Sequence, residues 1–159
     1  MIILDVVIRL TGTPSQHGWR VGPRRVDAID LTSSSDILMR GISLFGSLSG
    51  ADIRNGKIQF KETASKKIII SENFQFASNG NYFDHMFSSP GIVKAGVKYT
   101  VTVEYYDTEN IHYAEDGLAS VTAVCNGKTV NIDFSDSSDD SNGSSVTYGG
   151  QIPRILISC

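Results

Sequence analysis

Hydrophobic and polar residues alternate strictly between Val97 and Tyr105, and this is the clearest pattern in the chain. Successive side chains of a β-strand point to opposite faces, so a period of two predicts a strand with one face in a core and one in water. On a helix the same apolar residues would spread around the whole circumference. A strand with one solvent-exposed face is typical of an antiparallel sheet, and its apolar face needs a second layer to cover it.

Similar but shorter apolar runs recur along the chain, and none has a convincing helical period. We expect strands at these positions: Leu4–Leu10, Val26–Leu31, Asp36–Ser49, Ile53–Lys61, Lys67–Ser71, Tyr82–Phe87, Ile92–Val93, Ala119–Val124, Thr129–Phe134 and Gln151–Ser158. Short strands separated by turns predict an all-β fold. We therefore predict an antiparallel β-sandwich, jelly-roll-like, that forms a single domain over residues 1–159.

Turns are predicted wherever Gly, Asn, Ser and Pro cluster between the apolar runs. Asn126-Gly127 is the strongest signal, because both central residues of a type I′ hairpin need a positive φ. Loops are expected at Thr11–Arg25, Thr63–Lys67, Asn73–Asn81, Asp107–Gly117 and Ser135–Ser144, and turns at Asn55-Gly56, Asn79-Gly80, Ser88–Gly91 and Ala95-Gly96. Trp19, the one tryptophan, falls in the first loop, where it either plugs the end of the sandwich or stays exposed as a binding anchor.

The bulk composition narrows the possible functions. The 159 residues are 40% hydrophobic, which is enough for a core, and they carry a net charge of −3. An acidic balance argues against a domain that grips nucleic acid through its phosphates. No apolar run approaches the roughly 20 residues that span a bilayer. Met1–Leu10 is interrupted by Asp5, so we expect a first strand there and not a signal peptide.

The two cysteines, Cys125 and Cys159, are too few for a small disulfide scaffold. We favour two free thiols in a reduced intracellular protein, while a single bridge between them stays open.

Residues with catalytic or metal-binding chemistry form no familiar motif. His17, His85 and His112 lie far apart, so a structural zinc site is not expected. The acidic run at Asp133, Asp136, Asp139 and Asp140 lacks the glycine and glutamate spacing of a calcium loop, and we interpret it as a solvated loop. We predict no cofactor and no metal. A Cys–His pair or two carboxylates across a cleft stay open as enzyme alternatives.

Four stretches of the sequence resemble the PHR domain, named for the Pam, Highwire and Rpm proteins. The C-terminal stretch Asn142–Ile157 contains Asn-Gly-Ser-Ser-Val and then Gly-Gln-Ile-Pro before an apolar strand. Asp27–Ile29, Gly41–Ser47 and Gly96–Thr100 are similar to three further family motifs, in the same order. The resemblance runs from about Val7 to the end of the chain.

The resemblance implies an antiparallel β-sandwich that acts as an interaction module and not as an enzyme. PHR domains occur in very large RING-type ubiquitin ligases of neurons, similar to Myc-binding protein 2, and in BTB-domain adaptors of cullin ubiquitin ligases. This chain departs from the BTB-type copies at Ser78–Phe87 and Ser135–Asp140, which favours the Pam/Highwire setting, with the BTB setting as the alternative. Protein partners and a cytoplasmic location, at axons and synapses, follow from the resemblance; we expect a monomer without membrane insertion.

The loops at the ends of a sandwich are where a rigid scaffold presents binding residues. We predict a binding surface made of Trp19, Phe45, Gly46, Asn142, Gly143, Ser145, Tyr148, Gly149 and Gln151. Each of these residues also has a structural interpretation, as a backbone or packing requirement. A lectin-like sandwich that binds a ligand is the remaining alternative, because the chain combines an acidic loop with aromatic residues.

Overall fold

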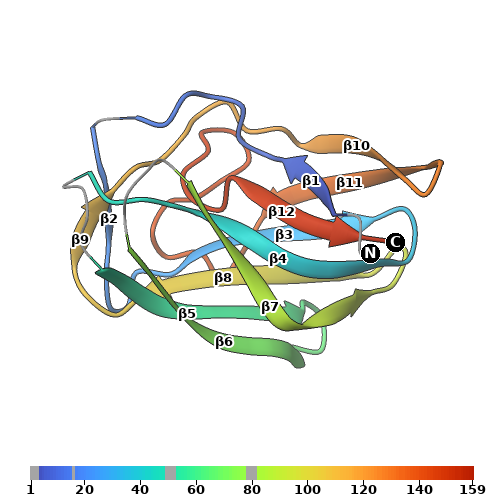
Figure 1. The fold of residues 1–159 in the computed structure, drawn as a ribbon, viewed down its shortest axis with the longest axis horizontal. Coiled ribbons are helices and arrows are strands. Elements are labelled where there is room, and N and C mark those ends of the chain that lie inside the picture. Colours follow the sequence, from blue (N-terminus) through green and yellow to red (C-terminus); the bar gives the residue numbers. More distant parts are fainter. Residues whose placement is uncertain (1–3, 16, 49–52, 78–81) are drawn as a thin grey trace.

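Two antiparallel sheets face each other in the computed structural model, which describes residues 4–15, 17–48, 53–77 and 82–159 (Figure 1). One sheet has four strands in the order β1-β12-β4-β7, the other has six in the order β10-β11-β3-β8-β5-β6, and β2 pairs with β9 in a small ribbon. The strands are β1 (Asp5–Ile8), β2 (Trp19–Val21), β3 (Asp27–Ser33), β4 (Ile37–Phe45), β5 (Ile53–Glu62), β6 (Ile68–Ala77), β7 (Tyr82–Val93), β8 (Lys98–Tyr105), β9 (Glu109–Ile111), β10 (Ser120–Cys125), β11 (Lys128–Asp136) and β12 (Arg154–Ser158). The predicted all-β sandwich is confirmed.

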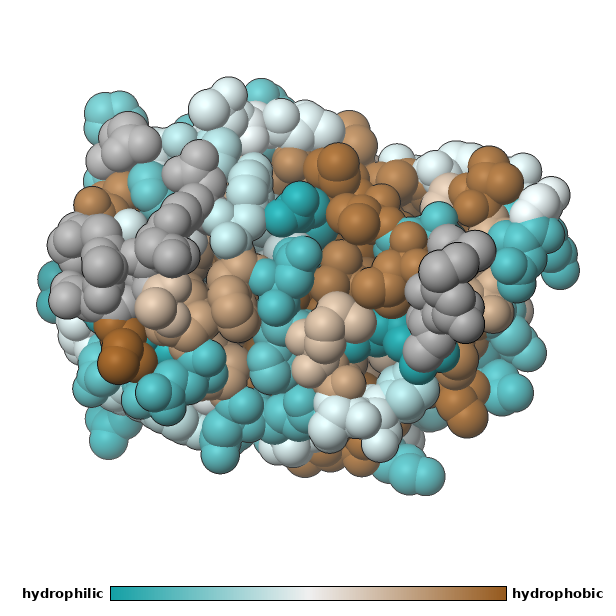
Figure 2. Space-filling view, viewed as in Figure 1, coloured by the Kyte–Doolittle hydropathy of each residue, from teal (hydrophilic) through white to brown (hydrophobic). Residues whose placement is uncertain are grey.

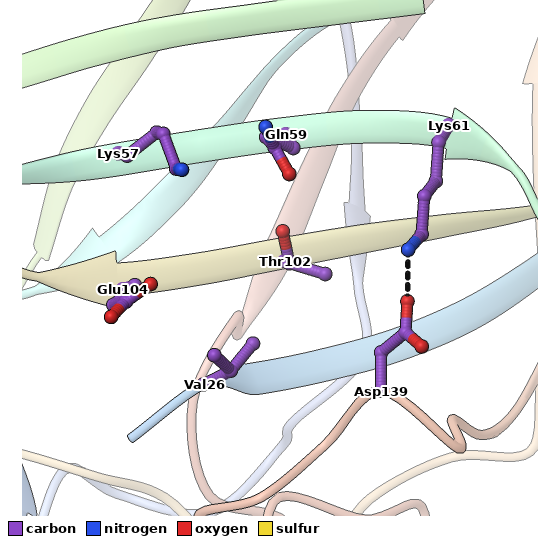
Figure 3. A pocket seen from close by; sticks show the side chains of 7 residues that line it. All are labelled: Val26, Lys57, Gln59, Lys61, Thr102, Glu104 and Asp139. Carbon is purple, nitrogen blue, oxygen red and sulfur yellow. Dashed lines mark ion pairs between the residues drawn. The ribbon is translucent and has the colours of Figure 1, made fainter. Parts of the chain in front are cut away.

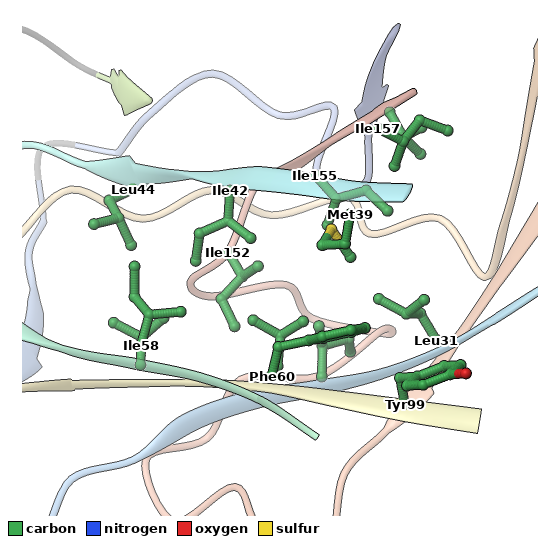
Figure 4. Packing of buried hydrophobic residues seen from close by; sticks show 14 of the residues in the cluster. Leu31, Met39, Ile42, Leu44, Ile58, Phe60, Tyr99, Ile152, Ile155 and Ile157 are labelled. Carbon is green, nitrogen blue, oxygen red and sulfur yellow. The ribbon is translucent and has the colours of Figure 1, made fainter. Parts of the chain in front are cut away.

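The core fills the space between the two sheets. Side chains of β4 and β12 point toward those of β3, β5 and β8 (Figure 4). Met39 and Ile42 on one side, and Ile58 and Phe60 on the other, are all fully buried. The ring of Phe60 stacks on that of Tyr99 with 5.1 Å between centroids, which adds a specific contact to the apolar burial.

The strand predicted from strict alternation is confirmed as β8, which lies between β3 and β5 in the six-stranded sheet. Its apolar residues face the core, as expected. Thr100 was expected in water but is 1% exposed. Its hydroxyl donates to Asp30 over 2.7 Å and lies 2.8 Å from the Thr63 hydroxyl, so local hydrogen bonds satisfy a polar group that alternation alone would place outside.

Two of the predicted turns are confirmed. Asn126 and Gly127 both have positive φ, 52° and 73°, and join β10 to β11. Gly96, with φ of 76°, turns the chain into β8. The Asn55-Gly56 prediction is wrong, because both residues lie inside β5. A Cβ on Gly56 would stand 2.4 Å from the Glu104 carbonyl oxygen, so this glycine permits a close approach of strands and makes no turn.

Four other predictions fail because strands extend into stretches that were expected to be turns or loops. The strand β6 runs on to Ala77, through the stretch expected to break at Asn73. Ser88–Gly91 lies within β7, whose register against β4 jumps from Met86 to Gly91, so this segment forms a bulge in place of a turn. The predicted Asn79-Gly80 turn lies outside the described residues. The loops expected around Trp19 and at Asp107–Gly117 contain β2 and β9, which pair with each other.

The two cysteines form a disulfide, so the expectation of two free thiols is wrong. Cys125 ends β10 in the six-stranded sheet, and Cys159 follows β12 in the four-stranded sheet. The hairpin of β10 and β11 brings their Cα atoms to 5.9 Å, well within bridging range. The bond therefore links the two layers at one end of the sandwich, an arrangement that the spacing of the cysteines could not reveal.

Removal of the disulfide should destabilise the domain. The bridge joins residues 34 apart in sequence, and loop closure of that size corresponds to about 3–4 kcal/mol. We expect the free energy of unfolding of Cys159→Ser, measured by urea denaturation without reductant, to fall by that amount. The wild-type protein measured with a reductant should fall to the same value, and equal stability of the oxidised wild type and the variant would contradict the prediction.

Candidate functional site

A buried carboxylate holds the C-terminal loop, which we define as residues Asn142–Gln151, against the end of β3. Asp27 is fully buried at the start of that strand. Its Oδ1 accepts hydrogen bonds from the Trp19 indole N–H at 3.1 Å and the Ser144 hydroxyl at 2.8 Å. Its Oδ2 accepts one from the Asn142 amide at 3.0 Å. One side chain thus joins the C-terminal loop to the N-terminal residues Trp19 and Asp27, more than 100 positions away in sequence.

A second buried charge fixes the same loop from the other side. Arg9 is fully buried, and its guanidinium donates from Nε to the Ile152 carbonyl at 3.0 Å and from Nη1 to the Ser145 carbonyl at 3.0 Å. Its Nη2 donates to the Gln151 carbonyl. Burial lowers the pKa of Arg9 to about 10, although Asp136, Asp27 and Asp140 oppose that shift, so the group keeps its charge at neutral pH. The planar guanidinium directs its three nitrogen atoms at three different carbonyl oxygens. A lysine ammonium has a single nitrogen and cannot reproduce this spread of donors.

The acidic run serves the protein itself and is not simply a solvated loop. Asp140 accepts hydrogen bonds from the backbone N–H groups of Ala28, Gly143 and Ser144. The other three carboxylates are also engaged: Asp133 with the Ser120 hydroxyl, Asp136 with the Val146 N–H and Asp139 with the Lys61 ammonium. Within the described residues, no three His, Cys, Asp or Glu side chains gather as metal ligands.

The structure brings most of the predicted site residues to one end of the sandwich, but at different depths. Phe45, Gly46, Gly149 and Gln151 are buried, Trp19, Asn142 and Ser145 are half-buried, and Gly143 and Tyr148 are exposed. The Gln151 amide donates to the His112 carbonyl at 2.8 Å, and the His112 N–H donates to the Gly46 carbonyl at 2.9 Å, which connects the two groups of residues. The buried members support the surface; their role in binding stays a prediction.

Sequence reasoning missed the residues that hold this end together. Arg9, Asp27, Asp140 and Ser144 were not predicted as site residues, yet they make most of its buried polar contacts. Arg9 carried a visible signal, because a charged residue stands there within an apolar run. Asp27 lies in one of the four family motifs, but neither it nor Asp140 could be recognised as a support of the loop, since aspartates are frequent in this chain and the partners of both are distant in sequence.

Tyr148 is presented on a short turn with a fixed backbone. The side chain is 79% exposed. Ser145 and Gly149 exchange backbone hydrogen bonds of 2.8 and 3.2 Å, and the Tyr148 N–H donates to the Ser145 hydroxyl at 3.0 Å. A Cβ on Gly149 would lie 2.3 Å from the Ala114 carbonyl oxygen, so the turn can pack this closely only with glycine. An exposed aromatic ring on a rigid turn suits protein recognition, because little order is lost on binding.

The outer face of the six-stranded sheet carries a shallow polar hollow of about 230 Å³ (Figure 3). Strands β5 and β8 form its floor with Lys57, Gln59 and Thr102, and the acidic loop forms one wall. The ion pair of Lys61 and Asp139 ties that wall to the sheet. The lining offers hydrogen-bonding groups but no nucleophile beside a base, so this hollow can contact a polar segment and has no set of groups for a reaction.

Comparison with known proteins places the chain in a family. The model of the PHR domain matches residues 9–158. The chain belongs to the PHR domain family. The buried Arg9 is the first residue of that match. Among curated proteins it is 31% identical over 135 residues to BTB/POZ domain-containing protein 6 of Xenopus laevis, and 29% identical to BTB/POZ domain-containing protein 3 of Mus musculus, with 83% of this chain covered in each.

This PHR domain spans about a quarter of the length of those relatives, since the matches cover 24% of each. Both relatives are BTB/POZ domain-containing proteins by name. They therefore favour the BTB setting, which the sequence analysis kept as its alternative, over the Pam/Highwire setting. The preference for the Pam/Highwire setting rested on departures in two short stretches, Ser78–Phe87 and Ser135–Asp140, which together are a small part of the chain.

The buried carboxylate of Asp27 should make the PHR domain sensitive to pH. Burial raises the pKa of Asp27 to about 6, against the hydrogen bonds from Asn142, Ser144 and Trp19 that lower it. Trp19 is the only tryptophan and donates to Asp27, so its fluorescence reports the protonation of that group. We expect the emission to change with a midpoint near pH 6, and the change to disappear in Asp27→Asn. A pH-independent emission of the wild type would contradict this.

The sign of the effect on stability follows from the same pKa. Because the folded state binds this proton more tightly than the unfolded state, Asp27 favours folding most below pH about 4, and that contribution falls as the pH rises toward 6. We expect the free energy of unfolding of the wild type, taken relative to Asp27→Asn, to decrease over this interval and to stay level above it. A relative stability that rises with pH would overturn the assignment.

Loss of the Arg9 guanidinium should disrupt the loop end. Arg9→Met leaves three buried carbonyl groups without their donor and should cost about 3–5 kcal/mol of unfolding free energy, measured by urea denaturation. Arg9→Lys keeps the charge but cannot reach all three carbonyls, so it should lie between the wild type and Arg9→Met. If the free energy of unfolding of Arg9→Lys equals that of the wild type, the positive charge stabilises this end and the donor geometry of the guanidinium does not contribute.

Proposed function

We propose that this PHR domain is a non-catalytic protein-interaction domain of a BTB/POZ domain-containing protein, and that it recruits partner proteins. The observation that carries the proposal is the family match over residues 9–158 together with the BTB/POZ relatives. By the resemblance, the whole protein would act as an adaptor of a cullin ubiquitin ligase, so that the transfer chemistry resides in other subunits.

The loop end of the sandwich supports this proposal. Buried hydrogen bonds from Arg9 and to Asp27 fix the backbone, while Tyr148 projects from it. Two of the three histidine rings already have partners in the structure: His85 pairs with Glu72, and the His112 ring contacts the Ser15 carbonyl. A preorganised surface with one large exposed ring is what protein recognition requires.

A cytoplasmic location is part of the proposal. Disulfides persist in oxidising compartments and are rare in the cytosol, so the redox state of Cys125 and Cys159 in cells tests this part directly. Two reduced thiols, trapped by alkylation in intact cells, would support the cytoplasmic location. A fully oxidised pair would count against it.

Truncation of Tyr148 should weaken partner binding without unfolding the domain. We expect Tyr148→Ala to bind partners recovered by the wild type at least tenfold more weakly, because the ring is 79% exposed and its loss removes contact area only at the surface. Binding is measured by titration of a recovered partner against the purified domain, with thermal melting as the check on folding.

Tyr106→Ala is the matched control for this variant. Tyr106 is also an exposed tyrosine, 46% exposed, but it follows β8 and its hydroxyl contacts Asn73 on β6. It should leave partner binding unchanged. Equal loss in both variants would mean that the loop end is not the binding surface, and a domain that recovers no specific partner would contradict the proposed function as a whole.

A further inference from the structure

The outer face of the four-stranded sheet breaks the usual rule that the solvent side of a sheet is polar. Val6 and Ile8 of β1 and Met86 and Ile92 of β7 all point outward and are 45–57% exposed. Leu156 of β12 lies in one cross-strand row with Val6 and is already covered. We name these five residues the apolar face. Figure 2 shows brown side chains gathered over β1 and β12 on this side of the molecule.

The strand register explains why the residues form one surface. Leu156 pairs with both Val6 and Gly41, and Gly41 pairs with Met86, so that row crosses all four strands. A neighbouring row pairs Leu38 with Ile92. The residues that alternate with these along each strand, such as Val7 and Ile157, point the other way and fill the core. The apolar face is thus not needed for the core, and a contiguous apolar patch on a surface marks an interaction site.

The size of the face indicates what can cover it. Four strands about 4.8 Å apart are about 19 Å wide, and the nine residues of β4 at about 3.3 Å each are about 30 Å long. The flat footprint is about 570 Å² and carries four exposed apolar side chains, whereas each side of a standard protein interface contributes about 20–30 residues. A helix about 10 Å wide and about 16 residues long, which is about 24 Å, fits within it.

The charged residues on the apolar face indicate the sign of the charge that a partner should carry. Arg154 is engaged within the sheet, since it contacts Asp84 at 3.6 Å and stacks over the Tyr82 ring at 4.2 Å. Arg40, at the bulge of β4, donates from Nε to the Ser158 hydroxyl at 2.7 Å. No carboxylate among the described residues pairs with Arg40. Among the described residues of this face, the charge that lacks an opposite charge is therefore positive.

We propose that the apolar face is a second docking surface, and that it takes an amphipathic helical segment of a partner protein with acidic residues beside its apolar stripe. Residues spaced by three and four along the helix would cover Val6, Met86 and Ile92, and a carboxylate at the edge of the stripe would pair with Arg40. This surface is separate from the loop end around Tyr148 and does not depend on the function proposed for it.

A peptide selection tests the proposal. A phage-displayed library of peptides about 16 residues long is selected on the immobilised wild-type domain, with counter-selection on Met86→Ser/Ile92→Ser. We expect enriched sequences with apolar residues at helical spacing and Asp or Glu beside them. Both substituted side chains are exposed, so thermal melting should show a folded variant. Enriched sequences without a helical apolar period, or without an excess of acidic residues, would overturn the proposal.

One enriched peptide is then titrated against further variants of the domain. Binding should weaken at least tenfold in Met86→Ser/Ile92→Ser and stay unchanged in Val124→Ser, which removes an apolar side chain that is 64% exposed on β10 of the other sheet. Arg40→Glu should favour a peptide in which lysines replace the acidic residues over the original peptide. An unchanged preference in Arg40→Glu, or equal weakening in Val124→Ser, would contradict the proposed partner.

Sedimentation equilibrium of the free domain tests whether a second copy of the domain, and not a helical partner, covers the apolar face. We expect a monomer, because the apolar face has far fewer residues than one side of a standard interface. A dimer in the wild type that Met86→Ser/Ile92→Ser disperses would show that a second copy covers the face, and would overturn the helical partner.

Discussion

The loop end of this PHR domain depends on the burial of two opposite charges, Arg9 and Asp27, beneath a chain segment that has almost no regular secondary structure. Backbone carbonyl and N–H groups of such a segment cannot satisfy one another as they do in a sheet. Arg9 donates to the carbonyls of Ser145, Gln151 and the adjacent Ile152. Asp27 accepts from the Asn142 and Ser144 side chains at the start of the segment. Burial of charges is costly unless each is hydrogen-bonded in this way, so the loop and the charges require each other.

The same constraint explains why the predicted binding residues divide into two groups. Residues such as Gln151 and Gly149 are part of the hydrogen-bonded support, and substitution there would move the loop as a whole. Tyr148 takes part through its backbone only, so its ring is free to contact another molecule. Sequence similarity alone marks both kinds of residue equally. Burial and hydrogen bonds separate a residue that shapes the surface from one that touches a partner.

Sequence reasoning predicted the sandwich because alternation reports directly on which side chains are buried, as β8 shows. It failed where polar residues are satisfied by distant partners. Thr100 is buried because its hydroxyl donates to Asp30 and accepts from the Thr63 hydroxyl, and Gly56 sits inside a strand because another backbone approaches it. Neither relation is local in sequence. The disulfide and the Arg9 fork are of the same kind, since each joins the β1 or β10 region to the C-terminal residues.

The apolar residues of β1 show a different limit of sequence reasoning. They predict a strand, but they do not show whether one face or both faces of that strand are buried. Val6, Val7 and Ile8 are all apolar, and a strand buried on both faces would look the same. The structure shows that β1 is an edge strand with one face open, so the extra apolar residues do not serve the fold. Exposed apolar side chains favour aggregation unless something covers them. Their cost to the free domain is therefore consistent with the docking surface proposed for this face.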